Sequence, residues 1–118
     1  MLRNLLFSKI HRASVTDANL EYEGSLTIDA HLIELAQMKL HEKVLVVNLT
    51  NGARFETYII EGARHSGVIC ANGAAARLVQ PKDQVIIMAF ALMGEEEADN
   101  HKPLVIKVNS QNEPLSIP

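Results

Sequence analysis

Apolar and polar positions along much of this chain alternate with the two-residue period of β-strands. Residues 2–16 predict one long strand, and residues 25–29 predict a short one. On the long strand, alternation places Lys9 and His11 on one face and Ile10 on the other. We therefore expect a domain built mainly from strands.

Five later apolar runs also predict strands, at residues 44–49, 53–60, 67–71, 84–93 and 104–108. Asn51-Gly52 separates the first two runs, and this dipeptide between apolar segments is typical of a hairpin turn. Helical spacing occurs over residues 30–38, where Asp29 is placed to cap the N-terminus. With about seven strands and one clear helix, the pattern indicates a single β-barrel or sandwich-like domain over residues 1–118.

Two shorter segments complete this expectation. Residues 95–99 (EEEAD) predict a helical turn with a solvated face. Residues 109–118 are polar and contain two prolines, so we expect them to form a frayed tail.

Composition narrows the class of protein. The chain has 118 residues and a net charge of -3, which argues against the basic surface of a nucleic-acid-binding protein. Cys70 is the single cysteine, so no disulfide can close within one chain and a reducing compartment is compatible. The apolar run 85–93 is less than half of the roughly 20 residues that a membrane-spanning helix needs. We expect a cytoplasmic protein with no membrane or nucleic-acid partner.

Three stretches contain residue types that could carry chemistry. In Gly24-Ser25, a hydroxyl follows an unhindered glycine carbonyl, although most Gly-Ser pairs are only turns. Arg54 and Tyr58 lie four residues apart on one predicted strand face, where Arg offers a fork for a carboxylate and Tyr a phenolic proton. The run 72–76 (NGAAA) would let a ligand approach backbone N–H groups closely.

Other familiar signals are missing. The histidines show no metal-ligand spacing, so a zinc site is unsupported and we expect no metal. Cys70 lies in an apolar run and is predicted to be a small buried residue rather than a nucleophile. The glycines match no nucleotide-binding motif.

Five segments together resemble the pyruvoyl-dependent aspartate 1-decarboxylase family. They are MLRNLLFSKIHRASVT, LEYEGSLTID, TNGARFETY, GVICANGAAARL and PKDQVII, in the family's order and spacing from Met1 to about Val108. The resemblance implies a six-stranded double-psi β-barrel with a few short helices. It also implies a homotetramer with active sites between neighbouring subunits.

The resemblance implies that the precursor cleaves itself between Gly24 and Ser25. Ser25 Oγ would attack the Gly24 carbonyl, and elimination and hydrolysis would convert Ser25 into a covalent pyruvoyl group. Thr57 matches the family's oxyanion donor in this step, and Asn72 is implicated as support for processing. The pyruvoyl group would form a Schiff base with L-aspartate and act as the electron sink, without pyridoxal phosphate or a metal.

The resemblance also assigns substrate contacts. Tyr58 matches the proton donor that completes formation of β-alanine, a precursor of pantothenate. The remaining substrate-binding residues would be Lys9, Arg54, Thr57, Gly73, Ala74 and Ala75, with His11 and Tyr22 lining the site in secondary roles.

Some features depart from this picture. Strand alternation places Thr57 and Tyr58 on opposite faces, so a bulge, a strong twist or a misplaced strand would have to explain their shared site. The chain has Ala63, His65 and Arg77 where the family commonly has other residues, and their effect stays open. Two alternatives also stay open: a barrel of this fold that binds a ligand without cleaving itself, and a pyruvoyl decarboxylase for another small amino acid.

Overall fold

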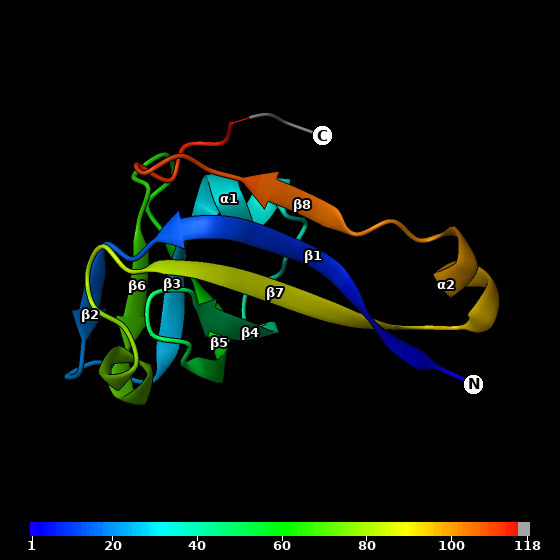
Figure 1. Ribbon diagram of the computed structural model, residues 1–118, viewed down its shortest axis with the longest axis horizontal. Helices are drawn as coiled ribbons and strands as arrows, with labels where there is room; N and C mark the ends of the chain where they lie inside the picture. Colours follow the sequence, from blue (N-terminus) through cyan, green and yellow to red (C-terminus); the bar gives the residue numbers. More distant parts are fainter. Residues whose placement is uncertain (116–118) are drawn as a thin grey trace.

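The computed structural model describes residues 1–115 and shows a mainly β protein with two short α-helices (Figure 1). Its strands are β1 (Arg3–Ser14), β2 (Asp17–Asn19), β3 (Ser25–Asp29), β4 (Lys43–Asn48), β5 (Arg54–Gly62), β6 (Ile69–Asn72), β7 (Gln84–Met93) and β8 (Leu104–Lys107). The helices are α1 (Ala30–Leu35), the 3-10 helix η1 (Gly73–Arg77) and α2 (Glu95–Asn100). The described strands form one sheet of eight, in the order β2-β6-β3-β5-β4-β7-β1-β8.

Neighbouring strands in this sheet are often distant in sequence. β4 and β5 form the antiparallel hairpin predicted at Asn51-Gly52, where Gly52 has a φ of 77°. In contrast, β3 runs parallel to β5, β2 runs parallel to β6, and β1 runs parallel to β8. These parallel pairs require crossover connections, so the sheet is not a simple meander.

The core lies on the inward face of the sheet. Ile10, Leu26, Ile59 and Ile87 are at most 2% exposed, and they come from β1, β3, β5 and β7. Ile10 is buried while Lys9 and His11 are only partly covered, as alternation along the first strand predicts. Burial of one face fixes the register, because a one-residue slip would expose this whole set.

The molecule has a rounded end and a narrow arm (Figure 1). The arm is the ribbon formed by the first residues of β1 and the last residues of β7, with α2 at its tip. It lengthens the molecule to 43 × 28 × 24 Å. Leu2 and Leu92 are each 64% exposed on this arm, so it presents apolar side chains away from the core.

The seven predicted strands correspond to observed ones, but the sheet has eight strands rather than the seven of the sequence pattern or the six that the resemblance implies. The additional strand, β2, is only three residues long and carries too short a pattern to be predicted. The helix is also shorter than predicted. Residues 25–29 and 84–93 are strands with the predicted bounds, and the Asp29 carboxylate caps α1 by accepting the His31 N–H at 2.8 Å. The helix ends at Leu35 rather than residue 38, because Gln37 adopts a left-handed conformation with φ 55°. Within residues 1–115, neither α-helix is long and apolar enough to cross a membrane.

The prediction of a frayed C-terminal tail is wrong for residues 109–115. Asn112 is 2% exposed, and its side-chain amide donates to the carbonyls of Ser14 and Gly67 at 2.8 and 2.7 Å. Its carbonyl oxygen accepts the Ser14 N–H at 2.7 Å. The Asn112 side chain therefore links residues 109–115 to the end of β1 and to the loop before β6 through hydrogen bonds. Residues 116–118 lie outside the described part of the chain.

Candidate active site

Strand β5 changes its partners along its length and so leaves an opening in the sheet. Residues 54–58 pair with β4 on one side, while pairing with β3 on the other side begins only at Leu26 and Ile59. Gly24 and Ser25 lead into β3 at this point. Within residues 1–115, no strand therefore pairs with this edge of β5 over residues 54–58, and a cavity lies there.

This cavity has a volume of about 360 Å³, which is within the range of small-molecule sites. Its lining residues come from β5, from η1 and its end, and from the turn before β3. They are Gly24, Phe55, Glu56, Thr57, Tyr58, Ala74, Ala75 and Leu78. Among the described residues, the cavity thus brings together five residues that the sequence suggested: Gly24, Thr57, Tyr58, Ala74 and Ala75.

Ser25 is held in a defined position beside this cavity. The residue is 2% exposed, and its Oγ accepts a hydrogen bond from Asn72 Nδ2 at 3.0 Å. The same amide nitrogen donates to Thr27 Oγ1 at 2.9 Å. The Ser25 hydroxyl donates back to the Glu23 carbonyl at 3.3 Å. The hydroxyl therefore points toward the Glu23 carbonyl, which belongs to the peptide that joins Glu23 to Gly24.

Asn72 reaches Ser25 because the two residues are cross-strand neighbours. β3 and β6 are antiparallel, and Ser25 pairs directly with Asn72. Side chains of such a pair share one face of the sheet and lie close together. Asn72 is 1% exposed, so its amide needs these hydrogen bonds to offset the cost of burial.

Gly73 packs so closely against residues 22–24 that no side chain would fit at position 73. It has a φ of 66°, and a Cβ at this position would lie 2.7 Å from both Cα and N of Gly24. It would also lie 3.0 Å from the carbonyl oxygen of Tyr22. Glycine is therefore required here by both conformation and contact.

Thr57 and Tyr58 share the cavity without a bulge in β5. The register between Lys43–Val47 and Arg54–Tyr58 is regular, and Thr57 and Tyr58 lie on opposite faces as alternation requires. Both line the cavity because it opens at the free edge of the strand, where either face can be reached. The bulge considered from the sequence is therefore not needed.

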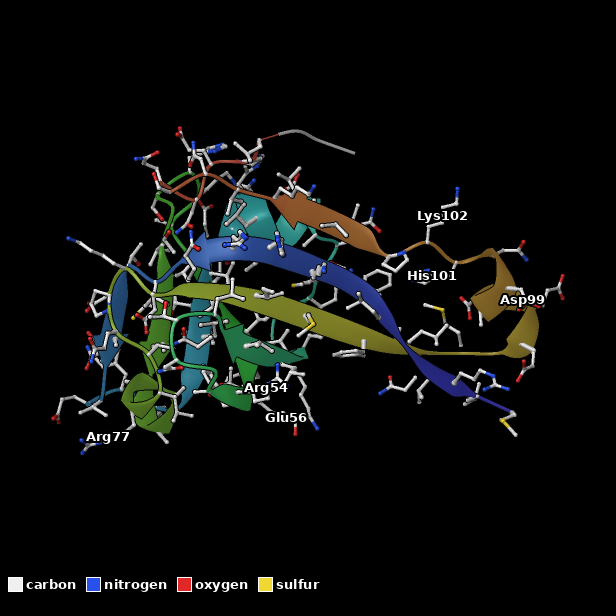
Figure 2. All side chains as sticks on the ribbon, in the orientation of Figure 1. Arg54, Glu56, Arg77, Asp99, His101 and Lys102 are labelled. Carbon is white, nitrogen blue, oxygen red and sulfur yellow. The ribbon has the colours of Figure 1, made fainter. Side chains whose placement is uncertain are left out.

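The two cations predicted to bind carboxylates lie apart in one chain. Arg54 is exposed and lines a neighbouring cavity of about 670 Å³, which shares Phe55 and Glu56 with the first. Figure 2 shows Arg54 and Glu56 projecting together from β5. Lys9 lines neither of these two cavities. Neither Lys9 nor Arg54 belongs to the ion pairs found among residues 1–115.

Register relations show how far Lys9 lies from the opening. Lys9 pairs with Met88, Met88 pairs with Leu45, and Leu45 pairs with Glu56. Three strand-to-strand steps of about 4.8 Å place the Cα atoms of Lys9 and Glu56 roughly 14 Å apart along the sheet. A lysine side chain, with its four methylenes, is too short to cover this distance.

The two residues assigned secondary roles have different surroundings. His11 is partly buried, and its Nδ1 atom is buried with no hydrogen-bond partner among residues 1–115. Burial, together with the charges of Lys9, Arg12 and Lys107, lowers the pKa of His11 below its usual value. Tyr22 is 65% exposed, and its carbonyl oxygen would lie 3.0 Å from a Cβ at position 73.

Sequence reasoning missed the contact that Cys70 makes. Cys70 is only partly buried, and its Sγ lies 3.3 Å from Asn72 Oδ1. The spacing of two residues on one strand was the signal that could have revealed it, because such residues share a face. The residues that depart from the family pattern, Ala63, His65 and Arg77, do not line the cavity beside Gly24 among the described residues.

Comparisons with known proteins agree across the chain. A family model described as aspartate decarboxylase matches residues 1–115. An aspartate 1-decarboxylase of Thermoanaerobacter pseudethanolicus is 58% identical over 117 residues, covering 99% of this chain and 100% of that protein. The aspartate 1-decarboxylase of Chlorobium limicola is 60% identical over 114 residues, covering 97% and 89%. That of Bacillus subtilis is 56% identical over 112 residues, covering 95% and 88%.

Proposed function

Because the chain belongs to the aspartate decarboxylase family, we propose that it supplies β-alanine for pantothenate biosynthesis. It is an aspartate 1-decarboxylase, a carboxy-lyase that removes the α-carboxylate of L-aspartate as CO₂. We further propose that it works in the cytoplasm, as a double-psi barrel assembled into a homotetramer, with a catalytic group made from its own Ser25.

The observation that carries this proposal is the position of Ser25. Its buried Oγ is fixed by Asn72 at 3.0 Å next to Gly24, which has no side chain to obstruct its carbonyl. The space next to Gly24 is open: a Cβ there would have the Asn72 carbonyl oxygen, at 4.0 Å, as its nearest described neighbour outside the adjoining residues. This arrangement supports attack by Ser25 Oγ on the Gly24 carbonyl carbon, with Ser25 nitrogen as the leaving group.

The surrounding residues supply what this attack requires. The Glu23 carbonyl oxygen accepts a hydrogen bond from the Ser25 hydroxyl at 3.3 Å, and this contact orients the hydroxyl. The Gly24 oxygen gains negative charge as the bond forms, and a positioned donor would stabilise it. Thr57 lines the same cavity as Gly24 and is our choice for this donor. Gly73 holds the segment in place by direct backbone contact.

Residue 25 also suits the cofactor that the family implies. After cleavage it would be the first residue of β3 and would end at the cavity beside Thr57 and Tyr58. A pyruvoyl group there would supply a ketone for the substrate amine and an electron sink for the loss of CO₂. Tyr58, 37% exposed at the cavity, would donate the proton to the α carbon.

Two carboxylates on the substrate call for two cations. Among residues 1–115, Lys43 and Arg54 both line the neighbouring cavity, but Lys43 is paired with Glu56 at 3.0 Å, which makes Arg54 our choice for a substrate carboxylate. Arg54 and the cavity beside Gly24 share the segment Phe55-Glu56, whereas Lys9 lies roughly 14 Å away from Glu56 along the sheet. We therefore assign Lys9 to the active site of a neighbouring subunit.

Intact mass spectrometry tests the proposal directly. Folded protein should resolve into fragments 1–24 and 25–118, and the larger should resist N-terminal sequencing because a ketone replaces its amine. Ser25→Ala should remain a single chain. A wild-type protein that stays whole after long warm incubation, and that releases no β-alanine from aspartate, would instead favour a binding barrel that does not process itself.

A further inference from the structure

We propose that Cys70 is a positioning residue for self-cleavage, because its thiol sets which end of the Asn72 amide faces Ser25. This inference rests on the proposed cleavage between Gly24 and Ser25. It gives a role to a cysteine that the mechanism above leaves unused.

An asparagine amide has two ends of similar shape and opposite hydrogen-bonding character. In this site the Asn72 nitrogen donates to both Ser25 Oγ and Thr27 Oγ1, at 3.0 and 2.9 Å. If the amide turned by 180°, its oxygen would face these hydroxyls. The Ser25 hydroxyl would then donate to Asn72 instead of Glu23, and Ser25 Oγ would lose the amide donor that now holds it in place.

The orientation of the Asn72 amide therefore depends on what its oxygen, Oδ1, contacts. Cys70 Sγ lies 3.3 Å from Asn72 Oδ1, within the distance of an S–H···O hydrogen bond. A thiol donates to an amide oxygen, while it offers the amide N–H₂ only a weak acceptor. The contact with Cys70 thus favours the orientation in which the nitrogen points to Ser25.

The structure fixes Cys70 in place and keeps it protonated. Its backbone pairs with Thr27 on β3 and with Asp17 on β2, so β6 is held on both sides. Burial, and to a lesser degree the charge of Asp17, raises the pKa of the Cys70 thiol. The group therefore remains S–H, the form that can donate, at neutral pH.

Three substitutions separate hydrogen bonding from packing. Cys70→Ser keeps a donor at the same place, Cys70→Ala removes it, and Cys70→Val removes it while filling the space. We expect Cys70→Ser to cleave within about twofold of the wild type. Cys70→Ala and Cys70→Val should cleave about three- to tenfold more slowly, the effect of one neutral hydrogen bond. Val105→Ala, in β8 and partly buried, controls for a general loss of stability.

Equal cleavage rates for Cys70→Ala and Cys70→Ser would overturn the inference. If both variants cleaved as fast as the wild type, the thiol would have no role in cleavage. If both were equally slow, packing of the sulfur atom would be the cause rather than its hydrogen bond. Rates are measured by mass spectrometry of freshly purified precursor at one temperature. Melting temperatures of all variants show whether unfolding contributes.

A second measurement does not depend on cleavage. In the Ser25→Ala precursor, NMR can follow hydrogen exchange of the Asn72 side-chain amide, which still donates to Thr27. We expect faster exchange with Cys70→Ala added and restored protection with Cys70→Ser. Unchanged exchange in both would refute the role of Cys70. If the wild type never cleaves, the proposed function fails, and this measurement still decides whether Cys70 orients Asn72.

Discussion

At the scale of single residues, the position of Gly24 depends on the close approach of its backbone to that of Gly73. Gly73 and Gly24 lie so near each other that a Cβ on Gly73 would come within 2.7 Å of Gly24 Cα. Real Cβ atoms do not tolerate such distances from backbone atoms, so one segment would have to move. The backbone around Gly24 can thus adopt its position only because Gly73 has no side chain.

Gly73→Ala should therefore block or greatly slow cleavage. The added methyl would push Gly24 away from its position, and alanine at φ 66° costs about 1–2 kcal/mol as well. Gly52→Ala is the matched control, because Gly52 has φ 77° but nothing within 4 Å of its would-be Cβ. It should lose similar stability in denaturant unfolding and still cleave. Normal processing of Gly73→Ala would contradict this account.

Thr57 and Tyr58 line one cavity but are expected to act at different times. Thr57→Val removes a donor to the developing oxyanion, so cleavage should slow by about 10²–10³-fold. Tyr58→Phe keeps the ring and should cleave at the normal rate, yet lose about 10²–10⁴-fold in β-alanine production because the proton donor is gone. Mass spectrometry follows the first effect and a β-alanine assay the second. Failure of Tyr58→Phe to cleave would show that the two roles are not separate.

At the scale of elements, Asp29 joins the end of β3, the start of α1 and the loop before β6. Its carboxylate accepts N–H bonds from His31, His65 and Gly67 at 2.8–2.9 Å, and the residue is 3% exposed. Burial alone raises the pKa of Asp29, but the three backbone donors outweigh it and hold the pKa below its ordinary value of 3.8. The junction is thus stabilised by the ionised form.

This junction predicts how stability depends on acid. A lowered folded-state pKa contributes stability that is present above the unfolded pKa and is lost as the pH falls below 3.8. Urea unfolding between about pH 5 and pH 2.5 should therefore show a smaller fall in unfolding free energy for Asp29→Asn than for the wild type. Asp99→Asn, an exposed carboxylate in α2 (Figure 2), controls for the loss of one charge. Parallel profiles for the wild type and Asp29→Asn would rule out this role.

At the scale of the whole molecule, the two cations predicted to bind the substrate carboxylates lie far apart within one chain. Arg54 lies next to the cavity beside Gly24, while Lys9 lies three strands away with His11 and Lys107 close by. The arm formed by β1 and β7 projects from the rounded end and exposes apolar residues that suit subunit contact (Figure 1). Assembly would bring the Lys9 of one subunit to the cavity of another.

Mixing two inactive variants tests this assembly. Lys9→Met and Arg54→Met should each cleave normally and each lose turnover of aspartate. When both chains are expressed together, random assembly should restore about a quarter of the sites, since each site takes its two cations from different subunits. Mixed and separate proteins are compared by β-alanine production per mole of fragment 25–118. No recovery on mixing would place Lys9 and Arg54 in the same chain's site.

The sequence by itself determined most of the strands. Alternation along residues 2–16 and the apolar run at 84–93 record burial of one strand face, and this information is local. The Asn51-Gly52 turn and the Asp29 cap are likewise local chemistry, and both are confirmed. The family resemblance, carried by segments such as YEGS, correctly identified the reaction from residue identities and their spacing.

Only the tertiary structure decided how these strands meet. The partner change along β5, which opens the cavity, depends on where β3 begins relative to Ile59, and no local pattern encodes this. The ordered C-terminal segment was missed because it depends on one buried side chain, Asn112, whose partners are Ser14 and Gly67. The two-residue spacing places Cys70 and Asn72 on one strand face, but only the pairing of β6 with β3 brings Asn72 to Ser25 and so gives their contact a role. Such arrangements follow from strand register and loop packing, which form between residues far apart in the chain and leave no periodic signal.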